Sequence, residues 1–155
     1  MKNKSFTISV KNAFLGFLHA LKSERNLRID IVIAILVMIF AYAYGLEPIG
    51  LGVLVLRICA VITAELFNTA IENAMDAVTE EYNEHIRFAK DISAAAVAVT
   101  AAGAVLVGIL LFLTDLDKLI IAILDIAYSK KALTAILVTF AIGMPFILQF
   151  KERKK

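Results

Sequence analysis

The side chains best suited to chemistry lie in one short segment, residues 64–78 (AELFNTAIENAMDAV). Four polar residues of this segment are spaced i, i+3, i+7 and i+11: Glu65, Asn68, Glu72 and Asp76. At about 100° per residue they fall within about 60° of one another on a helix. We call them the acidic stripe. Its three carboxylates would repel one another unless cations lay among them, so the pattern indicates a site for a cation or a cationic partner.

The chemistry that these groups can support is phosphoryl transfer. Clustered carboxylates are hard oxygen ligands that suit Mg²⁺, which commonly bridges to the phosphates of a substrate. Lys90 can neutralise phosphate charge. Glu65, which lies furthest toward the lipid, can act as a general base toward an alcohol. Since the sequence has neither a P-loop nor a kinase glycine-rich loop, ATP would be held through side chains and metal.

The elements that position this stripe are membrane helices. The chain is 61% hydrophobic with a mean hydropathy of +0.84, and its apolar residues collect in runs long enough to cross a hydrocarbon core. A soluble 17.0 kDa body would have too little polar surface to cover such helices. The single cysteine, Cys59, excludes an intramolecular disulfide. The predicted fold class is therefore an all-α polytopic membrane helix bundle.

Hydropathy predicts four spans, preceded by an amphipathic interfacial helix over residues 3–24. A soluble packing helix is the alternative for residues 3–24. A further apolar stretch at 119–128 is too short to span and predicts a re-entrant or surface piece. The spans are expected at residues 29–46, from 49 to beyond Asp76, at 92–113, and at 131–150, with a possible bend at Pro145.

The orientation follows from the positive-inside rule. With the N-terminus inside, 12 of the 16 Lys and Arg residues are cytoplasmic, and the outer loops keep Lys118, Lys130 and Lys131. Both termini are then cytoplasmic, and the active site faces the cytoplasm from the cell (inner or plasma) membrane. Arg57 lies within the membrane, where we expect it to snorkel to the outer interface or, alternatively, to bind a lipid phosphate or a carboxylate across subunits.

In this topology the polar groups converge at the cytoplasmic boundary. Lys90 and Asp91 open the third span there, and Glu24 closes the interfacial helix on the same side. No polar path continues to the opposite face, which argues against the rival from another class, a non-catalytic membrane subunit or small cation-binding transporter. Small residues of the third span are expected to pack against the acidic stripe: Ala94, Ala95, Ala98, Ala101 and Ala102.

These residues resemble a known family. The segments ELFNTAIE (65–72), Glu81-Tyr82 and AKD (89–91), together with ERNLRI (24–29), closely resemble the prokaryotic diacylglycerol kinase and undecaprenol kinase family over about residues 5–114. The resemblance implies a small homotrimeric lipid kinase with a surface helix and three spans per subunit. It also implies ATP as co-substrate and Mg²⁺ as cofactor, with no nucleic acid as partner.

The resemblance also implies roles for individual residues. Glu65 would be the general base, and Glu24 and Glu72 would hold Mg²⁺ with ATP. The remaining nucleotide contacts would come from a second group: Glu81, Tyr82, Asn83, Lys90 and Asp91. Polar support or substrate contact would come from a third: Asn68, Asp76, Arg28 and Ala94.

Three departures from the family pattern qualify this reading. Position 83 is Asn where the family often has His, and Leu15 precedes Gly16 where Lys is usual. Residues 115–155 have no counterpart, so the predicted organisation is a kinase domain over 1–114 and a C-terminal appendage over 115–155 that holds the fourth span. Sequence features around 10–29 resemble the branch that phosphorylates undecaprenol, so undecaprenol is the expected acceptor and diacylglycerol the alternative.

Overall fold

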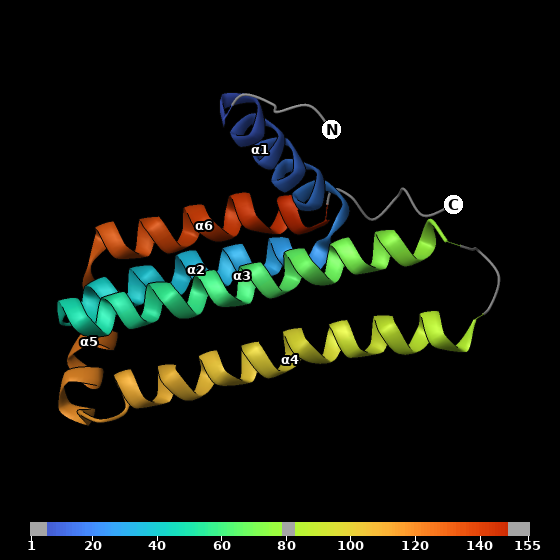
Figure 1. The fold of residues 1–155 in the computed structure, drawn as a ribbon. Coiled ribbons are helices and arrows are strands. Elements are labelled where there is room, and N and C mark those ends of the chain that lie inside the picture. The colour runs from blue at the N-terminus through green and yellow to red at the C-terminus, as the bar shows by residue number, and fades with distance from the viewer. Residues whose placement is uncertain (1–5, 79–82, 149–155) are drawn as a thin grey trace.

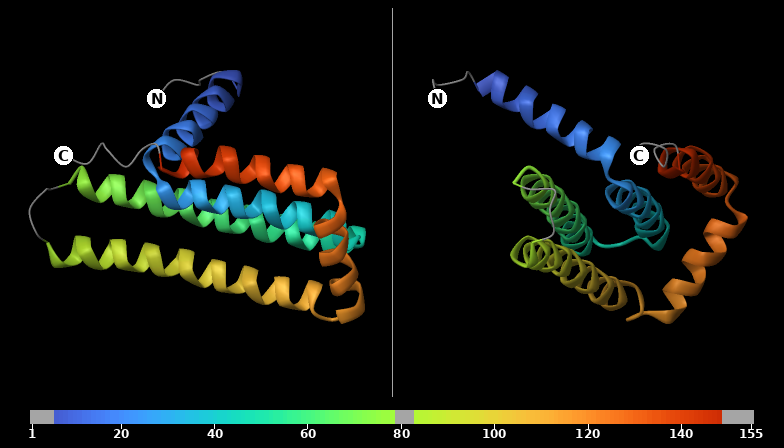
Figure 2. Two further views of the ribbon diagram at one scale, coloured as in Figure 1. Left: turned by 180° about the vertical axis from the view of Figure 1, so that it is seen from behind. Right: turned by 90° about the vertical axis from the view of Figure 1, so that its right-hand side faces the viewer.

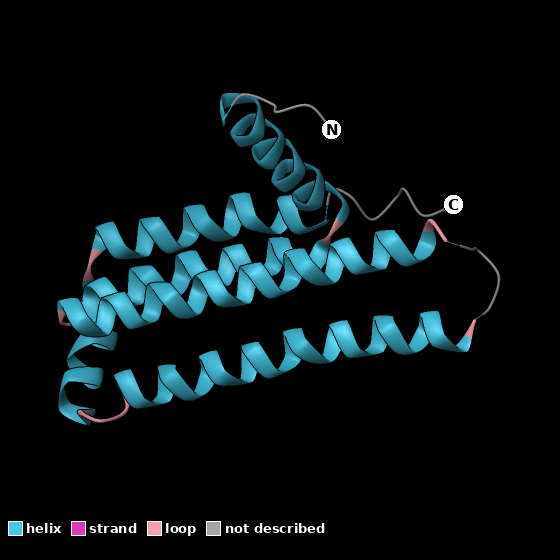
Figure 3. Cartoon of the chain, viewed as in Figure 1, coloured by secondary structure: helices cyan, strands magenta, loops and turns pink. Residues whose placement is uncertain are grey.

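The structure, a computed structural model, describes residues 6–78 and 83–148. Within these ranges every regular element is an α-helix (Figure 3). The helices are α1 (Phe6–Ser23), α2 (Arg25–Tyr44), α3 (Pro48–Asp76), α4 (Glu84–Phe112), α5 (Leu116–Tyr128) and α6 (Lys130–Leu148). Four of them, α2, α3, α4 and α6, are long and apolar enough to cross a bilayer. The predicted polytopic helical bundle is confirmed.

The four long helices lie side by side, while α1 leaves the bundle at an angle (Figures 1 and 2). We call the end where α1 joins α2, α3 ends and α4 begins the near end. At the opposite or far end, α2 turns into α3 and α5 crosses from α4 to α6. Helix α2 is central, because it packs against α1, α3, α5 and α6, whereas α4 packs mainly against α3.

The turn between α2 and α3 follows from two residues. Gly45 ends α2 in the left-handed region, at φ 63°, and its N–H donates to the carbonyl of Tyr42. The N–H of Leu46 donates to the carbonyl of Ala41, so the two bonds form the Schellman pattern that glycine favours. Pro48 then starts α3 at a position where its missing N–H costs nothing. The predicted break after the first span is thus explained.

Helices α3 and α4 are longer than a hydrocarbon core is thick. Each has 29 residues, which at ~1.5 Å per residue is about 43 Å, against about 30 Å for the hydrocarbon core. Helix α4 begins at Glu84, whereas hydropathy predicted a span that begins at 92, because its first two turns are polar. Glu65 lies about 26 Å from Pro48 along α3 and Asp76 about 42 Å, so a hydrocarbon core that begins at Pro48 would contain Glu65 and leave the Asp76 end of the acidic stripe beyond it.

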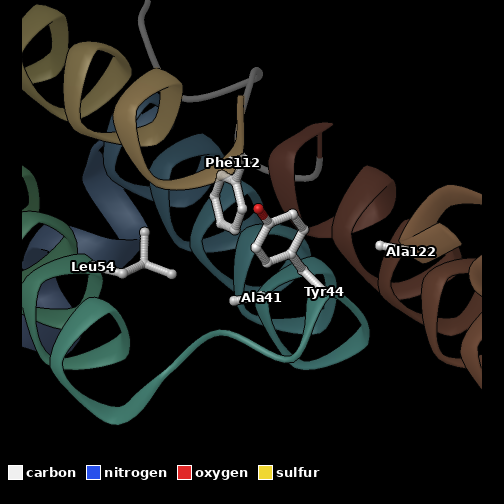
Figure 4. Packing of buried hydrophobic residues seen from close by; sticks show 5 residues of the cluster. All are labelled: Ala41, Tyr44, Leu54, Phe112 and Ala122. Carbon is white, nitrogen blue, oxygen red and sulfur yellow. The ribbon is translucent and has the colours of Figure 1, made fainter. Parts of the chain in front are cut away.

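The buried apolar cluster lies at the far end (Figure 4). The ring of Phe112 packs edge-on against Tyr44 at 5.2 Å and against Phe40 at 4.9 Å. Such edge-to-face pairs stabilise beyond their buried area. Lys118 closes the cluster, since its Nζ donates to the carbonyl of Gly45 at 3.0 Å and lies 4.9 Å from the centre of the Tyr44 ring.

The C-terminal helices attach to α2. Helix α5 is the short apolar stretch predicted as a re-entrant or surface piece, and it lies across the far end against α2 and α6. Helix α6 packs along α2, and a Cβ added at Gly143 would lie 3.0 Å from Val32. A small residue therefore permits this close approach. The predicted N-terminal helix is α1, whose position at a membrane interface stays a prediction.

Candidate active site

The acidic stripe lies on the face of α3 at the near end, and its exposure rises along the helix. Glu65 is 5% exposed and Asn68 is 9% exposed, whereas Glu72 is half-buried and Asp76 is exposed. The stripe thus leads from a buried carboxylate to a solvent-accessible one. A reactive group at Glu65 would be shielded from bulk water, while a soluble reagent could reach the Asp76 end.

A hydrogen-bond network orients the middle of the stripe. The Asn68 amide donates from Nδ2 to Glu72 Oε1 at 3.0 Å, and its Oδ1 accepts from the Ser93 hydroxyl at 2.6 Å. Ser93 is buried on α4, and its hydroxyl also lies 2.8 Å from the Lys90 carbonyl oxygen. With both ends of the amide bonded, Asn68 fixes one carboxylate oxygen of Glu72 and ties α3 to α4.

The open end of the stripe meets basic groups from α4. Lys90 forms an ion pair with Asp76, so the expected juxtaposition of a lysine with the stripe is present. Arg87 pairs with Asp91 at 3.6 Å one turn apart on the exposed surface of α4. The Asp91 carboxylate is therefore directed to Arg87 and not to α3.

Other carboxylates gather around Glu65. Glu24, Asp30 and Glu72 all lie close enough to interact with it electrostatically. Glu24 precedes α2 without capping it through its side chain, so its carboxylate is not used there. Asp30 has a buried carboxylate oxygen with no hydrogen-bond partner among the described residues. Glu65 is buried and the other three are half-buried, and carboxylates crowded in this way favour a cation between them.

The donor set fits Mg²⁺ held jointly with a nucleotide. Within residues 6–78 and 83–148, no group of three or more His, Cys, Asp or Glu side chains forms a ready-made metal cage. Mg²⁺ seldom uses such a cage, since it commonly takes one or two carboxylates and completes its shell with phosphate and water. Glu24 and Glu72, which both interact electrostatically with Glu65, are the two carboxylates that would serve.

Three other predicted site residues are described by the structure, and they have different settings. Arg28 is 2% exposed and donates to the backbone carbonyls of Leu21 and Lys22, which holds the end of α1 against α2. Asn83 caps α4, because its side chain accepts from the N–H groups of two following residues. Ala94 is exposed on α4. Glu81 and Tyr82 lie outside the described residues.

The prediction for the small residues of α4 is wrong. They were expected to pack against the acidic stripe, but Ala94, Ala95, Ala98 and Ala102 are exposed and Ala101 is half-buried. The α4 face that meets α3 instead carries Ser93, Val97 and Thr100, which are buried or half-buried. Hydropathy could not assign the correct face because every face of α4 is apolar.

Sequence reasoning missed two polar residues of the site. Ser93 follows Lys90 by three positions and so lies on the same helix face, a spacing that could have identified it. Asp30 lies near the start of the first predicted span, where no spacing relates it to the acidic stripe. Only the packing of α2 on α3 brings it near Glu65.

Arg57 does not snorkel as expected. Its Nη2 donates to the backbone carbonyl of Thr100 on α4 at 3.0 Å, and the guanidinium lies over Gly103. A Cβ at position 103 would overlap Nη2. The Nε of Arg57 is buried and has no hydrogen-bond partner among the described residues. The absence of a side chain at Gly103 is what lets this arginine turn inward and link α3 to α4.

Comparison with known proteins gives a consistent result. The family model described as prokaryotic diacylglycerol kinase matches residues 11–112. A diacylglycerol kinase from Synechocystis sp. is 37% identical over 115 residues, which are 74% of this chain and 66% of that protein. An undecaprenol kinase from Bacillus subtilis is 31% identical over 123 residues, which are 75% of this chain and 100% of that protein. The chain thus spans just under two thirds of the first relative. No solved structure matches significantly.

Proposed function

The chain belongs to the prokaryotic diacylglycerol kinase family, and from that premise we propose that it is an ATP- and Mg²⁺-dependent lipid kinase of the bacterial cell membrane. It transfers the γ-phosphoryl group of ATP to the hydroxyl of a membrane lipid alcohol. The observation that carries this proposal is the buried Glu65 at the lipid end of a stripe whose other end is open to solvent.

The residues divide the work of the reaction. Glu65 accepts the hydroxyl proton as the alcohol oxygen bonds to the γ-phosphorus, and the bond from that phosphorus to the β–γ bridging oxygen breaks to release ADP. Glu24 and Glu72 would hold Mg²⁺, which would supply neutralisation of phosphate charge. Lys90 exchanges its pairing with Asp76 for a phosphate oxygen. Asn68 and Ser93 keep Glu72 oriented.

The proposed acceptor is undecaprenol. The match covers the whole of the Bacillus protein, which is named undecaprenol kinase. Diacylglycerol is the second candidate, because the Synechocystis protein, named diacylglycerol kinase, is the more identical of the two. Both acceptors present a hydroxyl at the end of a long apolar body. The chemistry at the hydroxyl is therefore the same, and only the contacts with the apolar part of the lipid differ.

We further propose a homotrimer with both termini and the acidic stripe on the cytoplasmic side. Support for the orientation comes from the basic residues at the near end, including Lys22 and Lys90. Support for assembly comes from α4, whose exposed alanines form a strip that lets another helix approach closely.

The test is a kinase assay of the purified full chain in micelles. Mg-ATP is supplied with undecaprenol and with diacylglycerol separately, and phosphorylated lipid is measured. We expect turnover of undecaprenol, and a loss of about 100- to 10,000-fold in kcat for Glu65→Gln. Glu47→Gln is the matched control, because it makes the same change from carboxylate to amide at an exposed residue at the other end of α3. We expect it to keep full activity.

The outcomes separate the parts of the proposal. Phosphorylation of neither alcohol would overturn the kinase assignment. Turnover of diacylglycerol alone would replace the acceptor and leave the reaction intact. Full activity in Glu65→Gln would remove the assignment of the base.

A further inference from the structure

A second candidate binding site, with a polar mouth and an apolar wall, lies at the far end of the bundle, away from the acidic stripe. A cavity of ≈ 970 Å³ opens between α2, α3, α5 and α6, which is at the upper limit of ordinary ligand sites, about 300–1,000 Å³. Six of its 16 lining residues come from α5, α6 and the link between them, which lie outside the residues that match the family, and the other ten come from α2 and α3. This chain's C-terminal region therefore completes the cavity and supplies three of its four polar lining residues.

Polar and apolar residues line different parts of the cavity. Its polar members are all at the far end: Tyr42, Asp125, Ser129 and Lys131. The rest of the wall is almost wholly aliphatic and continues down α2 to Ile31 and along α3 to Ile62. From Tyr42 to Ile31 is 11 residues, or about 16 Å, close to half of the ~30 Å hydrocarbon core. The cavity thus has the polarity profile and the length of one membrane leaflet.

The charges at its mouth are of opposite sign and are not used within the fold. Asp125 and Lys131 are both exposed, and the described residues contain no ion pair between them or from either to another side chain. Tyr42 is 90% exposed and carries a phenol that can donate a hydrogen bond. A matching head group needs an anionic group for Lys131 and a cationic hydrogen-bond donor for Asp125.

We propose that this cavity binds one zwitterionic phospholipid of the phosphatidylethanolamine type. Its phosphate lies at Lys131 and Tyr42, its ammonium donates to Asp125, and its acyl chains fill the aliphatic wall toward Ile62. A lipid alcohol substrate fits less well, because its hydroxyl must reach Glu65 at the other end and would leave the charged mouth unmatched. An anionic phospholipid would satisfy Lys131 but repel Asp125.

The experiment is native mass spectrometry of the full-length chain in detergent. Phosphatidylethanolamine, phosphatidylcholine and phosphatidylglycerol with identical acyl chains are added separately, without ATP. We expect the ethanolamine lipid to bind about fivefold more tightly than the other two, the size expected of a solvent-accessible charge pair. Phosphatidylcholine lacks the N–H donor, and phosphatidylglycerol lacks the cation.

Two substitutions of the charged residues at the cavity mouth are expected to change lipid binding in different ways. Asp125→Asn is expected to remove the preference for phosphatidylethanolamine, whereas Lys131→Gln is expected to weaken all three lipids by about fivefold. Asp117→Asn and Lys130→Gln are matched controls, because both residues are exposed at the far end and neither lines the cavity. The controls keep wild-type binding.

A third variant tests the acyl-chain wall. Ala135→Phe fills the cavity from α6 and is expected to abolish binding of every lipid, while Ala141→Phe, exposed on the same helix, has no effect. Equal binding of the three lipids, retention in Ala135→Phe, or a change of oligomeric state in Ala135→Phe without a change in lipid binding would each overturn the proposal. The last outcome would identify the occupant as a second copy of the chain. None of these readouts depends on kinase activity.

Discussion

The two ends of this bundle are built in opposite ways. At the far end, aromatic rings and small aliphatic groups of α2, α3, α4 and α5 close on one another around Phe112. At the near end the buried groups that link α3 to α4 are polar, and each is held by one or two hydrogen bonds through Asn68 and Ser93. The far end is held together by apolar packing, whereas the near end depends on individual polar atoms that a ligand can engage.

This contrast is physically useful for a membrane enzyme. A polar network can exchange a protein partner for a ligand atom at little net cost, because hydrogen bonds are replaced and not lost. An aromatic cluster has no such exchange available and stays closed. We therefore expect changes at the far end to alter stability and changes at the near end to alter turnover.

The largest effect is expected for Phe112→Ala, which should lower stability and leave turnover unchanged. Removing a buried ring that two other rings contact should lower the free energy of unfolding by about 3–5 kcal/mol, while kcat of the folded fraction stays unchanged. Reversible unfolding in mixed micelles followed by circular dichroism measures the first quantity. The matched control is Phe88→Ala, which removes an exposed ring near the acidic stripe and should cost far less stability.

Next in size is Ser93→Ala. The variant leaves the buried Asn68 Oδ1 without its donor, which should cost about 1–3 kcal/mol of unfolding free energy. With Asn68 free to rotate, Glu72 loses its orientation, and KM for Mg-ATP should rise more than kcat falls. Thr134→Ala, which removes an exposed hydroxyl of α6, is the control. Unchanged kinetics in Ser93→Ala would contradict the positioning role of the network.

A smaller effect is expected for Gly103→Ala. The new Cβ displaces the Arg57 guanidinium and breaks its bond to the Thr100 carbonyl, at about 1–2 kcal/mol. Gly108→Ala is the control on the same helix, since a Cβ there meets nothing within 4 Å. The double variant Arg57→Met with Gly103→Ala should recover most of the loss, because methionine needs no carbonyl partner. Additive losses would refute the proposed contact.

The smallest effect is expected at the exposed pair of Arg87 and Asp91. Both side chains are about two-thirds exposed, so Arg87→Gln should change the unfolding free energy by less than about 0.5 kcal/mol. Thermal unfolding at low and high salt measures it. A loss above 1 kcal/mol would show that the near end depends on its surface charges, and the contrast between the two ends would weaken.

Much of the fold could be predicted because lipid imposes a length and a polarity on each span. The turn at Gly45 and Pro48 and the stripe from Glu65 to Asp76 follow from local rules of backbone conformation and helical period. The start of α4 at Glu84 was missed because hydropathy detects only the part of a helix that lies in lipid. Asn83 caps α4, and an Asn before a helix is a local signal for its start; the predicted nucleotide contact of Asn83 stays a prediction.

The remaining features depend on contacts between distant segments. Which α4 face meets α3 is decided by Ser93 and by the space above Gly103, and a uniformly apolar helix carries no periodic signal for it. The inward turn of Arg57 and the approach of Asp30 to Glu65 likewise appear only once helices are packed. Sequence pattern gives the elements and the stripe, and packing gives the neighbours of each polar atom.

The seat of α6 on α2 has a consequence for how copies of the chain can meet. Val32 of α2 lies against Gly143, so α6 covers a side of α2 that the family-matched residues 11–112 leave uncovered. In the proposed homotrimer, contacts between protomers would then fall mainly to α4, whose outward surface carries small alanines flanked by bulky aliphatics. Helix α6 would thus restrict the directions in which copies of the chain can associate.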